Sequence, residues 1–164
     1  MEKELVEMSD ISKPRVAIVM GSESDRPFMS ETEKLLGELG VPCKLEVMSA
    51  HRTPTKVHEL AANAREQGIE VVIAGAGGAA HLPGVIASWT TLPVIGVPLP
   101  TSDLNGMDAL LAIVQMPAGV PVATVAVGKA GARNAAILAA QIIATGDETV
   151  RAAVERHRES IGGK

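Results

Sequence analysis

The feature that most constrains the fold is the alternation of short apolar, β-rich runs with segments of helical periodicity. Most of these runs are apolar throughout, which is typical of parallel strands buried on both faces. They cover residues 15–20, 45–48, 71–74, 94–97 and 123–127. Because each run is followed by a helical pattern, right-handed crossovers are expected, and the chain is predicted to form an α/β three-layer sandwich with a central parallel sheet.

The helical segments have recognisable ends. Gly40 can end the first helix, Thr53 can cap the second with Pro54 in its first turn, and Asp147 can cap the last. Residues 134–144 are apolar nearly all round, which predicts a helix buried on more than one side. The predicted helices lie at about 28–39, 54–64, 82–88, 108–114, 134–144 and 150–161.

Length and composition restrict the class of protein. The 164 residues suit one domain, so residues 14–164 are predicted to form a single catalytic α/β domain after a flexible polar arm at 1–13. The net charge is −4, with no Lys/Arg cluster and almost no aromatic side chains, which argues against nucleic acid or membrane partners. Cys43 is the only cysteine, so a reducing, cytoplasmic location is expected.

Charge is scarce in the second half of the chain. Between residues 71 and 146, only Asp103, Asp108, Lys129 and Arg133 are charged. Because exposed faces normally need charge, this half is predicted to be covered by other copies in a homo-oligomer. The alternative is a monomer with an unusually apolar surface.

Two polar loops follow the first two predicted strands. Ligands of such folds bind beyond the carboxyl ends of the strands, so these loops are candidate sites. The first contains Ser22, Ser24 and Asp25, whose hydroxyls and helix-opening amides suit a phosphate, although helix capping by Ser24 or Asp25 is the simpler interpretation. The second contains His51, which can exchange protons near neutral pH, and Arg52, which can bind phosphate or carboxylate; surface polarity alone is the alternative.

The loop after the third predicted strand is rich in small residues. Residues 75–84 read Gly-Ala-Gly-Gly-Ala-Ala-His-Leu-Pro-Gly, so backbone can approach a neighbour closely. Two interpretations stay open: backbone amides that bind an anionic or carbonyl group, and close packing against a helix or another subunit. The sequence has neither a dinucleotide-binding fingerprint nor a P-loop, and its histidines lack the spacing of zinc ligands, so neither cofactor nor metal is expected.

Together the three loops resemble class I N5-carboxyaminoimidazole ribonucleotide mutases of bacterial purine biosynthesis. The matching motifs run in order along nearly the whole chain, from about residue 15 to the last helix. They are Gly-Ser-x-Ser-Asp at 21–25, Ser-Ala-His-Arg-Thr-Pro at 49–54, Ala-Gly-Ala-Gly-Gly-Ala-Ala-His-Leu-Pro-Gly at 74–84, Gly-Val-Pro at 96–98, Ile-Val-Gln-Met-Pro at 113–117 and Gly-Lys-Ala-Gly-Ala at 128–132. Two segments depart from the family pattern, Arg26-Pro27 and residues 100–105, and both are expected to affect subunit packing or loop mobility more than chemistry.

The resemblance implies a flavodoxin-like fold, a homo-octamer and a cofactor-free reaction. That reaction moves a carboxylate from the exocyclic amine of the ribonucleotide to its ring carbon, with His51 as general acid and base. The implied substrate-binding residues are Ser22, Asp25, Ser49, Arg52, Gly77, Ala80 and His81. Two alternatives remain: a carboxylase that takes free CO2 onto aminoimidazole ribonucleotide, and a non-catalytic nucleotide-binding module of the same fold.

Overall fold

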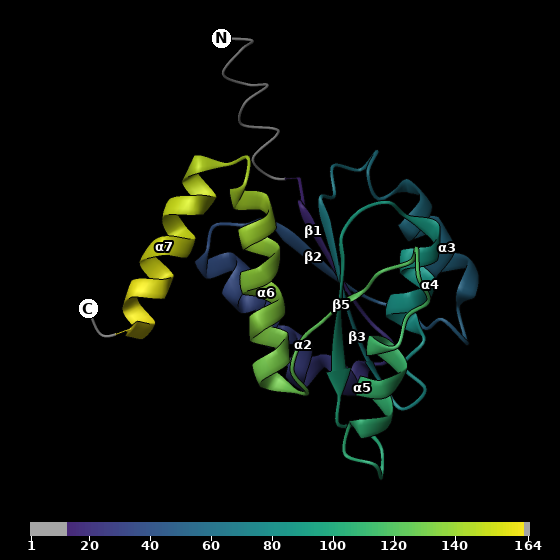
Figure 1. Ribbon diagram of the computed structural model, residues 1–164. Helices are drawn as coiled ribbons and strands as arrows, with labels where there is room; N and C mark the ends of the chain where they lie inside the picture. Colours follow the sequence, from purple (N-terminus) through teal and green to yellow (C-terminus); the bar gives the residue numbers. More distant parts are fainter. Residues whose placement is uncertain (1–12, 163–164) are drawn as a thin grey trace.

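The computed structural model describes residues 13–162, so the arm predicted at 1–13 lies outside the described residues except for Lys13. A parallel sheet of five strands, in the order β2-β1-β3-β4-β5, forms the centre of this part of the chain (Figure 1). The strands are β1 (Val16–Met20), β2 (Cys43–Val47), β3 (Val71–Gly77), β4 (Val94–Leu99) and β5 (Ala123–Thr124). The predicted parallel sheet is therefore confirmed.

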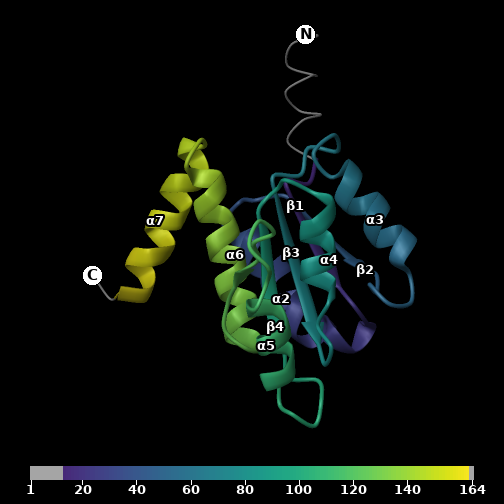
Figure 2. The same cartoon turned by 45° about the vertical axis from the view of Figure 1, so that its right-hand side comes forward.

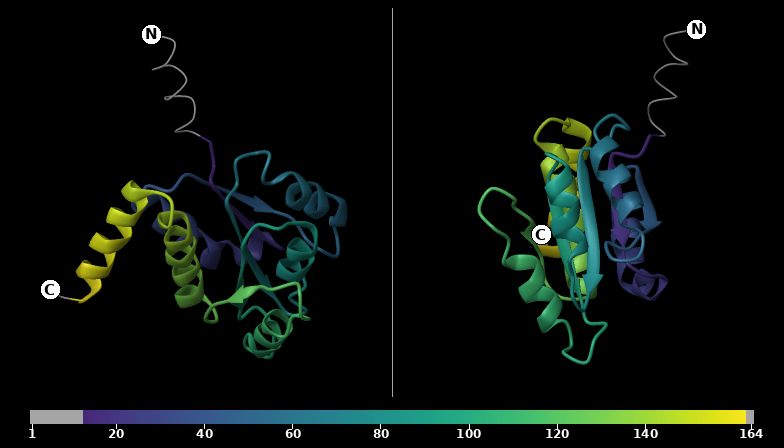
Figure 3. Two further views of the ribbon diagram at one scale, coloured as in Figure 1. Left: turned by 45° about the horizontal axis from the view of Figure 1, so that its top comes forward. Right: turned by 90° about the vertical axis from the view of Figure 1, so that its right-hand side faces the viewer.

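Helices cover both faces of the sheet, which completes the predicted three-layer sandwich (Figures 2 and 3). They are α2 (Arg26–Glu38), α3 (Pro54–Asn63), α4 (Leu82–Trp89), α5 (Met107–Val114), α6 (Lys129–Ala144) and α7 (Glu148–Gly162), with a short 3-10 helix η1 (Glu23–Asp25) before α2. Among residues 13–162, no helix is both long enough and apolar enough to cross a membrane.

Alternate residues of each central strand point into two separate cores. Val16 and Ile18 of β1 pack with α2 and α6, whereas Ala17 and Val19 pack with α3, α4 and α5. Both faces of the central strands are buried, which explains why their sequences are continuously apolar. Helix α6 lies between α2 and α7, and α7 covers its outer side (Figure 2), so the prediction of a helix buried on more than one side is confirmed.

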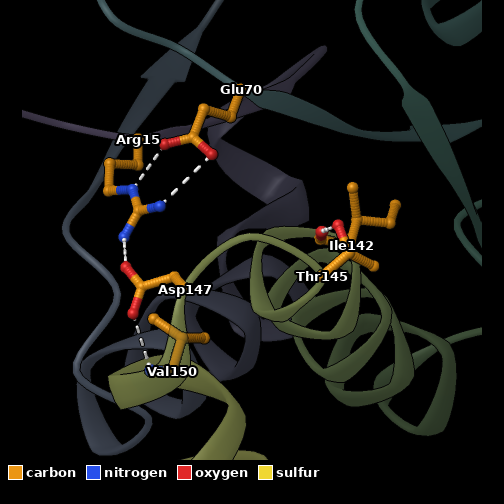
Figure 4. Close-up of polar contacts among 6 residues, drawn as sticks. All are labelled: Arg15, Glu70, Ile142, Thr145, Asp147 and Val150. Carbon is orange, nitrogen blue, oxygen red and sulfur yellow. Dashed lines mark hydrogen bonds and ion pairs between the residues drawn. The ribbon is translucent and has the colours of Figure 1, made fainter.

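The observed helix ends agree with those predicted from the sequence, with one exception. Gly40 has φ +71°, and the amides of Gly40 and Val41 donate to the carbonyls of Gly37 and Leu36, so α2 ends in a Schellman motif. Asp147 caps α7 by accepting a hydrogen bond from the Val150 amide at 3.0 Å (Figure 4). The prediction for Thr53 is wrong in its chemistry: it occupies the position before α3, but its side chain makes no capping bond.

Strand lengths differ from the prediction in both directions. Strands β3 and β4 extend to Gly77 and Leu99, past glycines and a proline that are unfavourable in strand interiors. The segment predicted as a strand at 123–127 pairs only over Ala123–Thr124, and the chain then turns toward α6. The longer β3 and β4 bring their carboxyl ends, and the residues after them, into the same region as the polar loops.

Candidate active site

A cleft of about 330 Å³ lies at the carboxyl edge of the sheet, the edge toward which the β3 arrow points in Figure 1. Its walls come from the loops after β1, β2, β3 and β4. It is lined by Gly21, Ser22, Ser24, Asp25, Ser49, Ala50, His51, Arg52, Ala76, Gly77, Ala79, His81, Leu82 and Thr101. The structure therefore brings together every site residue expected from the sequence except Ala80, whose side chain is buried behind the loop.

The first loop is built as a capping turn whose free surface faces the cleft. The Ser22 amide donates to Asp25 Oδ2 at 3.1 Å, while Ser22 Oγ accepts from the amide of Ser24 at 3.4 Å. Capping thus explains part of this polarity, with Ser22 rather than Ser24 as the capping side chain. The same turn also lines the cleft with Ser22, Ser24 and Asp25, so the two interpretations are compatible.

Asp25 is a buried carboxyl group at this edge, only 4% exposed. Burial raises its pKa, and the hydrogen bonds from the amides of Ser22 and Gly21, together with the positive charge of Arg52, oppose that shift. Burial makes this carboxyl group costly to ionise. Hydrogen bonds donated by a ligand would stabilise its ionised form.

The second loop is held by its own hydroxyl groups. Ser49 Oγ accepts from the amides of His51 and Arg52 at 3.3 and 3.2 Å. Thr53 Oγ1 accepts from the Ser49 amide at 2.8 Å and donates to the Ser49 carbonyl at 3.2 Å, which is why it cannot cap α3. Arg52 Nη2 donates to the Gly21 carbonyl at 2.9 Å, so its guanidinium group joins the second loop to the first.

His51 and His81 meet at the cleft. Nε2 of His51 lies 2.8 Å from Nδ1 of His81, and the two rings are nearly perpendicular at 84°. A hydrogen bond between two ring nitrogens requires a proton on one of them, so one of these two nitrogens donates and the other accepts. Both rings are exposed, which leaves them accessible to a ligand in the cleft.

The small residues of β3 and its loop have two different roles. A Cβ on Gly75 would lie 2.4 Å from Sδ of Met29, so this glycine permits packing against α2, as one of the two interpretations expected. A Cβ on Gly77 would lie 1.7 Å from Thr101 Oγ1, so that glycine leaves room for a side chain of the cleft. The amide of Ala80 donates to the Gly78 carbonyl within the loop at 2.8 Å and is therefore already bonded.

Thr101 is a cleft residue that the sequence analysis missed. It follows β4 and belongs to the 100–105 segment, which is expected to affect subunit packing or loop mobility more than chemistry, whereas the sequence points to the loops after the first three strands. The rule that points to the carboxyl ends of parallel strands applies equally to β4. The sequence feature that could have identified Thr101 is its position shortly after an apolar run. The predicted strand ends at residue 97, two residues before the observed end of β4.

Two other groups bear on the chemistry. Burial, and then the negative charge of Glu33, raise the pKa of the Cys43 thiol to about 11, so this thiol is a poor nucleophile near neutral pH. Within residues 13–162, no group of three or more His, Cys, Asp or Glu side chains is placed to hold a metal ion.

Comparison with known proteins identifies the family of this chain. Residues 15–163 match the model of the AIR (aminoimidazole ribonucleotide) carboxylase family. The chain belongs to this family. N5-carboxyaminoimidazole ribonucleotide mutase of Bacillus subtilis is 57% identical over 148 residues, covering 90% of this chain and 91% of that protein. The mutase of Thermotoga maritima is 56% identical over 148 residues, covering 90% and 85%.

Solved structures of the AIR carboxylase family share this architecture. The crystal structure of Treponema denticola PurE superposes with a TM-score of 0.80 at 27% sequence identity, covering 92% of each chain. The flavodoxin-like α/β sandwich implied by the resemblance is therefore confirmed.

One departure from the AIR carboxylase family pattern is accommodated next to the site. Arg26 pairs with Glu23 on the surface, with Nε 2.6 Å from Oε2. Pro27 lies in the first turn of α2, where an amide hydrogen is not needed for the helix. Neither residue lines the cleft, and Arg26 contacts the Ser22–Asp25 turn only through Glu23, on its surface side.

Proposed function

We propose that this chain is an N5-carboxyaminoimidazole ribonucleotide mutase of purine biosynthesis, with His51 as its general acid and base. Curated relatives that bear this name are 51–60% identical to it over most of its length. The structural observation that supports the proposal best is the 2.8 Å contact between His51 Nε2 and His81 Nδ1 beside an Arg- and Ser-lined cleft. It combines a proton-transfer group with a site suited to a phosphorylated ligand.

The reaction needs one proton given and one taken. The C–N bond of the carbamate breaks, CO2 leaves, and the electron pair remains on the exocyclic nitrogen, which accepts a proton. The ring carbon then attacks the CO2, a C–C bond forms, and the same carbon loses its proton. His51 can perform both transfers and return to its starting state, so no redox step or cofactor is required. His81 orients the His51 ring and shares its proton.

The phosphate and ribose are assigned to the first two loops. Arg52 uses Nη2 on the Gly21 carbonyl, and its remaining N–H groups can bind phosphate with help from Ser22. Asp25 accepts ribose hydroxyls, and Ser49 shapes the loop through its bonds to His51 and Arg52. Gly77, Ala80 and His81 then belong to the loop that holds the carboxylate.

A carbon-labelling experiment tests this function. The purified protein is given carbamate substrate labelled with 13C in its carboxylate, without ATP, in unlabelled bicarbonate. We expect the 4-carboxy product to retain most of the label, because the CO2 stays in the cleft. The carboxylase alternative predicts unlabelled product and a rate that rises with bicarbonate. Binding without turnover would favour the non-catalytic module.

We further propose a homo-octamer located in the cytoplasm. Four apolar side chains on α5 and the loop before it face solvent in one subunit: Leu104 (64% exposed), Met107 (58%), Leu111 (58%) and Val114 (48%). The support for assembly therefore lies on α5, because α7 already covers the outer side of α6. The single cysteine suits the reducing cytoplasm, and the sequence has no Lys/Arg cluster suited to nucleic acid.

A further inference from the structure

We propose that Thr101 is a substrate-binding residue whose hydroxyl group binds the migrating carboxylate beside Gly77, an inference that rests on the mutase function proposed above. Thr101 lines the cleft two residues after β4 ends at Leu99. Its Oγ1 lies in the space that a Cβ on Gly77 would fill, only 1.7 Å from that position. Any larger residue at 77 would displace this hydroxyl, so the glycine and the threonine form one unit of the cleft wall.

The Thr101 hydroxyl is free to bind a ligand. Four hydroxyl side chains line the cleft: Ser22, Ser24, Ser49 and Thr101. Ser22 and Ser24 bond to each other at 3.0 Å, and Ser49 Oγ accepts from two amides. Within residues 13–162, Thr101 Oγ1 alone among the four makes no hydrogen bond, so both its donor and its acceptor capacity remain available.

The turn that follows Thr101 is closed by hydrogen bonds of its own. Ser102 Oγ donates to Asp108 Oδ2 at 2.6 Å and accepts from the Leu104 amide at 3.3 Å, which joins both ends of the turn. Asn105 and Gly106 complete the turn with φ values of +52° and +87°. A cleft wall whose backbone is already ordered loses less conformational entropy when it binds a ligand. Ser102 and Asp108 are therefore positioning residues for Thr101.

The strand order assigns Thr101 to the carboxylate rather than to the phosphate. Arg52 contacts Gly21 after β1, whereas Thr101 contacts Gly77 at the end of β3, and β4 lies on the side of β3 away from β1. A hydroxyl donor next to a loop of small residues suits one oxygen of a carboxylate, or of CO2 during its transfer. Together with His81, it would restrict the escape of CO2 from the cleft.

The test compares two ligands that differ only in the carboxylate. Binding of 4-carboxy-5-aminoimidazole ribonucleotide and of aminoimidazole ribonucleotide is measured by calorimetry for the wild type, Thr101→Val and Thr101→Ser. We expect Thr101→Val to weaken the carboxylated ligand about tenfold, as for one hydrogen bond to a charged group, and the other ligand less than about twofold. Thr101→Ser should restore the affinity. Thr149→Val, an exposed threonine on α7, is the matched control.

A double-mutant cycle tests the positioning role. Ser102→Ala should weaken the carboxylated ligand by roughly twofold or more in the wild type, yet change nothing further once Thr101 is valine. Suppose that the wild type transfers the label. The assignment would then be overturned if Thr101→Val lost the same affinity for both ligands, or if its affinity for the carboxylated ligand were unchanged. If the wild type fails to transfer the label, the mutase function fails first and the assignment falls with it.

Discussion

At the residue scale, the contact between His51 and His81 joins two loops that are 30 positions apart in the sequence. Neither histidine identifies the other in the sequence, because the motifs that contain them follow different strands. In the fold, β2 and β3 flank β1, and their loops reach across its end. The proposed acid–base function therefore depends on the sheet order as much as on the histidines.

We expect His51→Asn to bind the ribonucleotide but to lose turnover. Asparagine retains polarity without accepting and releasing protons near neutral pH, and general acid–base catalysis typically contributes roughly 10²–10⁴-fold. Turnover is measured by the label-transfer assay and binding by calorimetry. His58→Asn is the control, because its ring stacks edge-on against Trp89 with centroids 4.1 Å apart and lies outside the cleft. Normal turnover in His51→Asn would refute the role.

Asp25 should make the empty protein less stable at neutral pH. Burial raises its pKa in the folded state, so its ionisation opposes folding as the pH rises through that value. We expect Asp25→Asn to raise the melting temperature at pH 7. Well below pH 4, where the carboxyl group is protonated in both the folded and the unfolded state, the melting temperatures of the variant and the wild type should agree. The variant should also bind ligand more weakly. Thermal unfolding across pH measures this, with the exposed Glu38→Gln as control. A lower melting temperature at pH 7 would contradict the prediction.

At the element scale, one arginine joins the beginning of the sheet to the beginning of α7 (Figure 4). Arg15 Nε lies 2.5 Å from Glu70 Oε1, and its Nη1 lies 2.6 Å from Asp147 Oδ2. The Val150 amide, and then Arg15, lower the pKa of Asp147. This cluster fixes the start of a helix that otherwise packs mainly against α6.

Removing the cap should therefore loosen α7. We expect Asp147→Ala to lower the free energy of unfolding by about 1 kcal/mol at pH 7, and Asp147→Asn by less, because asparagine still caps but lacks the charge for Arg15. The difference from the wild type should shrink as pH falls below about 4, through the lowered pKa of Asp147, because the protonated carboxyl no longer stabilises the fold. Denaturant unfolding at fixed protein concentration measures this.

The control for the cap is Glu148→Gln. Glu148 pairs with the exposed Arg151 on the same helix, and exposed pairs of this kind contribute little. A loss in Glu148→Gln equal to that in Asp147→Ala would show that general charge, rather than capping, stabilises the start of α7.

At the scale of the whole molecule, α5 carries a group of apolar side chains that one subunit leaves exposed. Met107, Leu111 and Val114 recur at helical spacing along it, and the turn that positions Thr101 leads directly into this helix. Covering α5 with a second copy would stiffen that turn. Closed symmetric assembly is the usual way to bury such a patch.

We expect light scattering at micromolar concentration to find a symmetric homo-oligomer, with the mass of eight chains. Leu111→Glu should shift it to smaller species, because burying an unpaired charge in an apolar contact is unfavourable. Glu38→Lys, a charge change on the exposed side of α2, should leave the assembly intact. A fully active monomer of the wild type would refute both the assembly and its role in the site.

Much of this architecture was predictable because it depends on local physics. Continuous apolar runs indicate buried parallel strands, Asp147 and Gly40 mark helix ends, and the rule of carboxyl strand ends points to the Ser22, His51 and His81 loops. Each of these inferences needs only neighbouring residues and a known backbone period.

The tertiary structure alone decided what depends on partners distant in sequence. It determined that Gly75 makes room for Met29 but Gly77 for Thr101, that Thr53 bonds to Ser49 instead of capping α3, and that β3 and β4 run on through glycine and proline. A missing side chain has the same sequence signature whether a helix or a ligand fills the space. Only packing, which sums contacts across the whole chain, settles which neighbour occupies it.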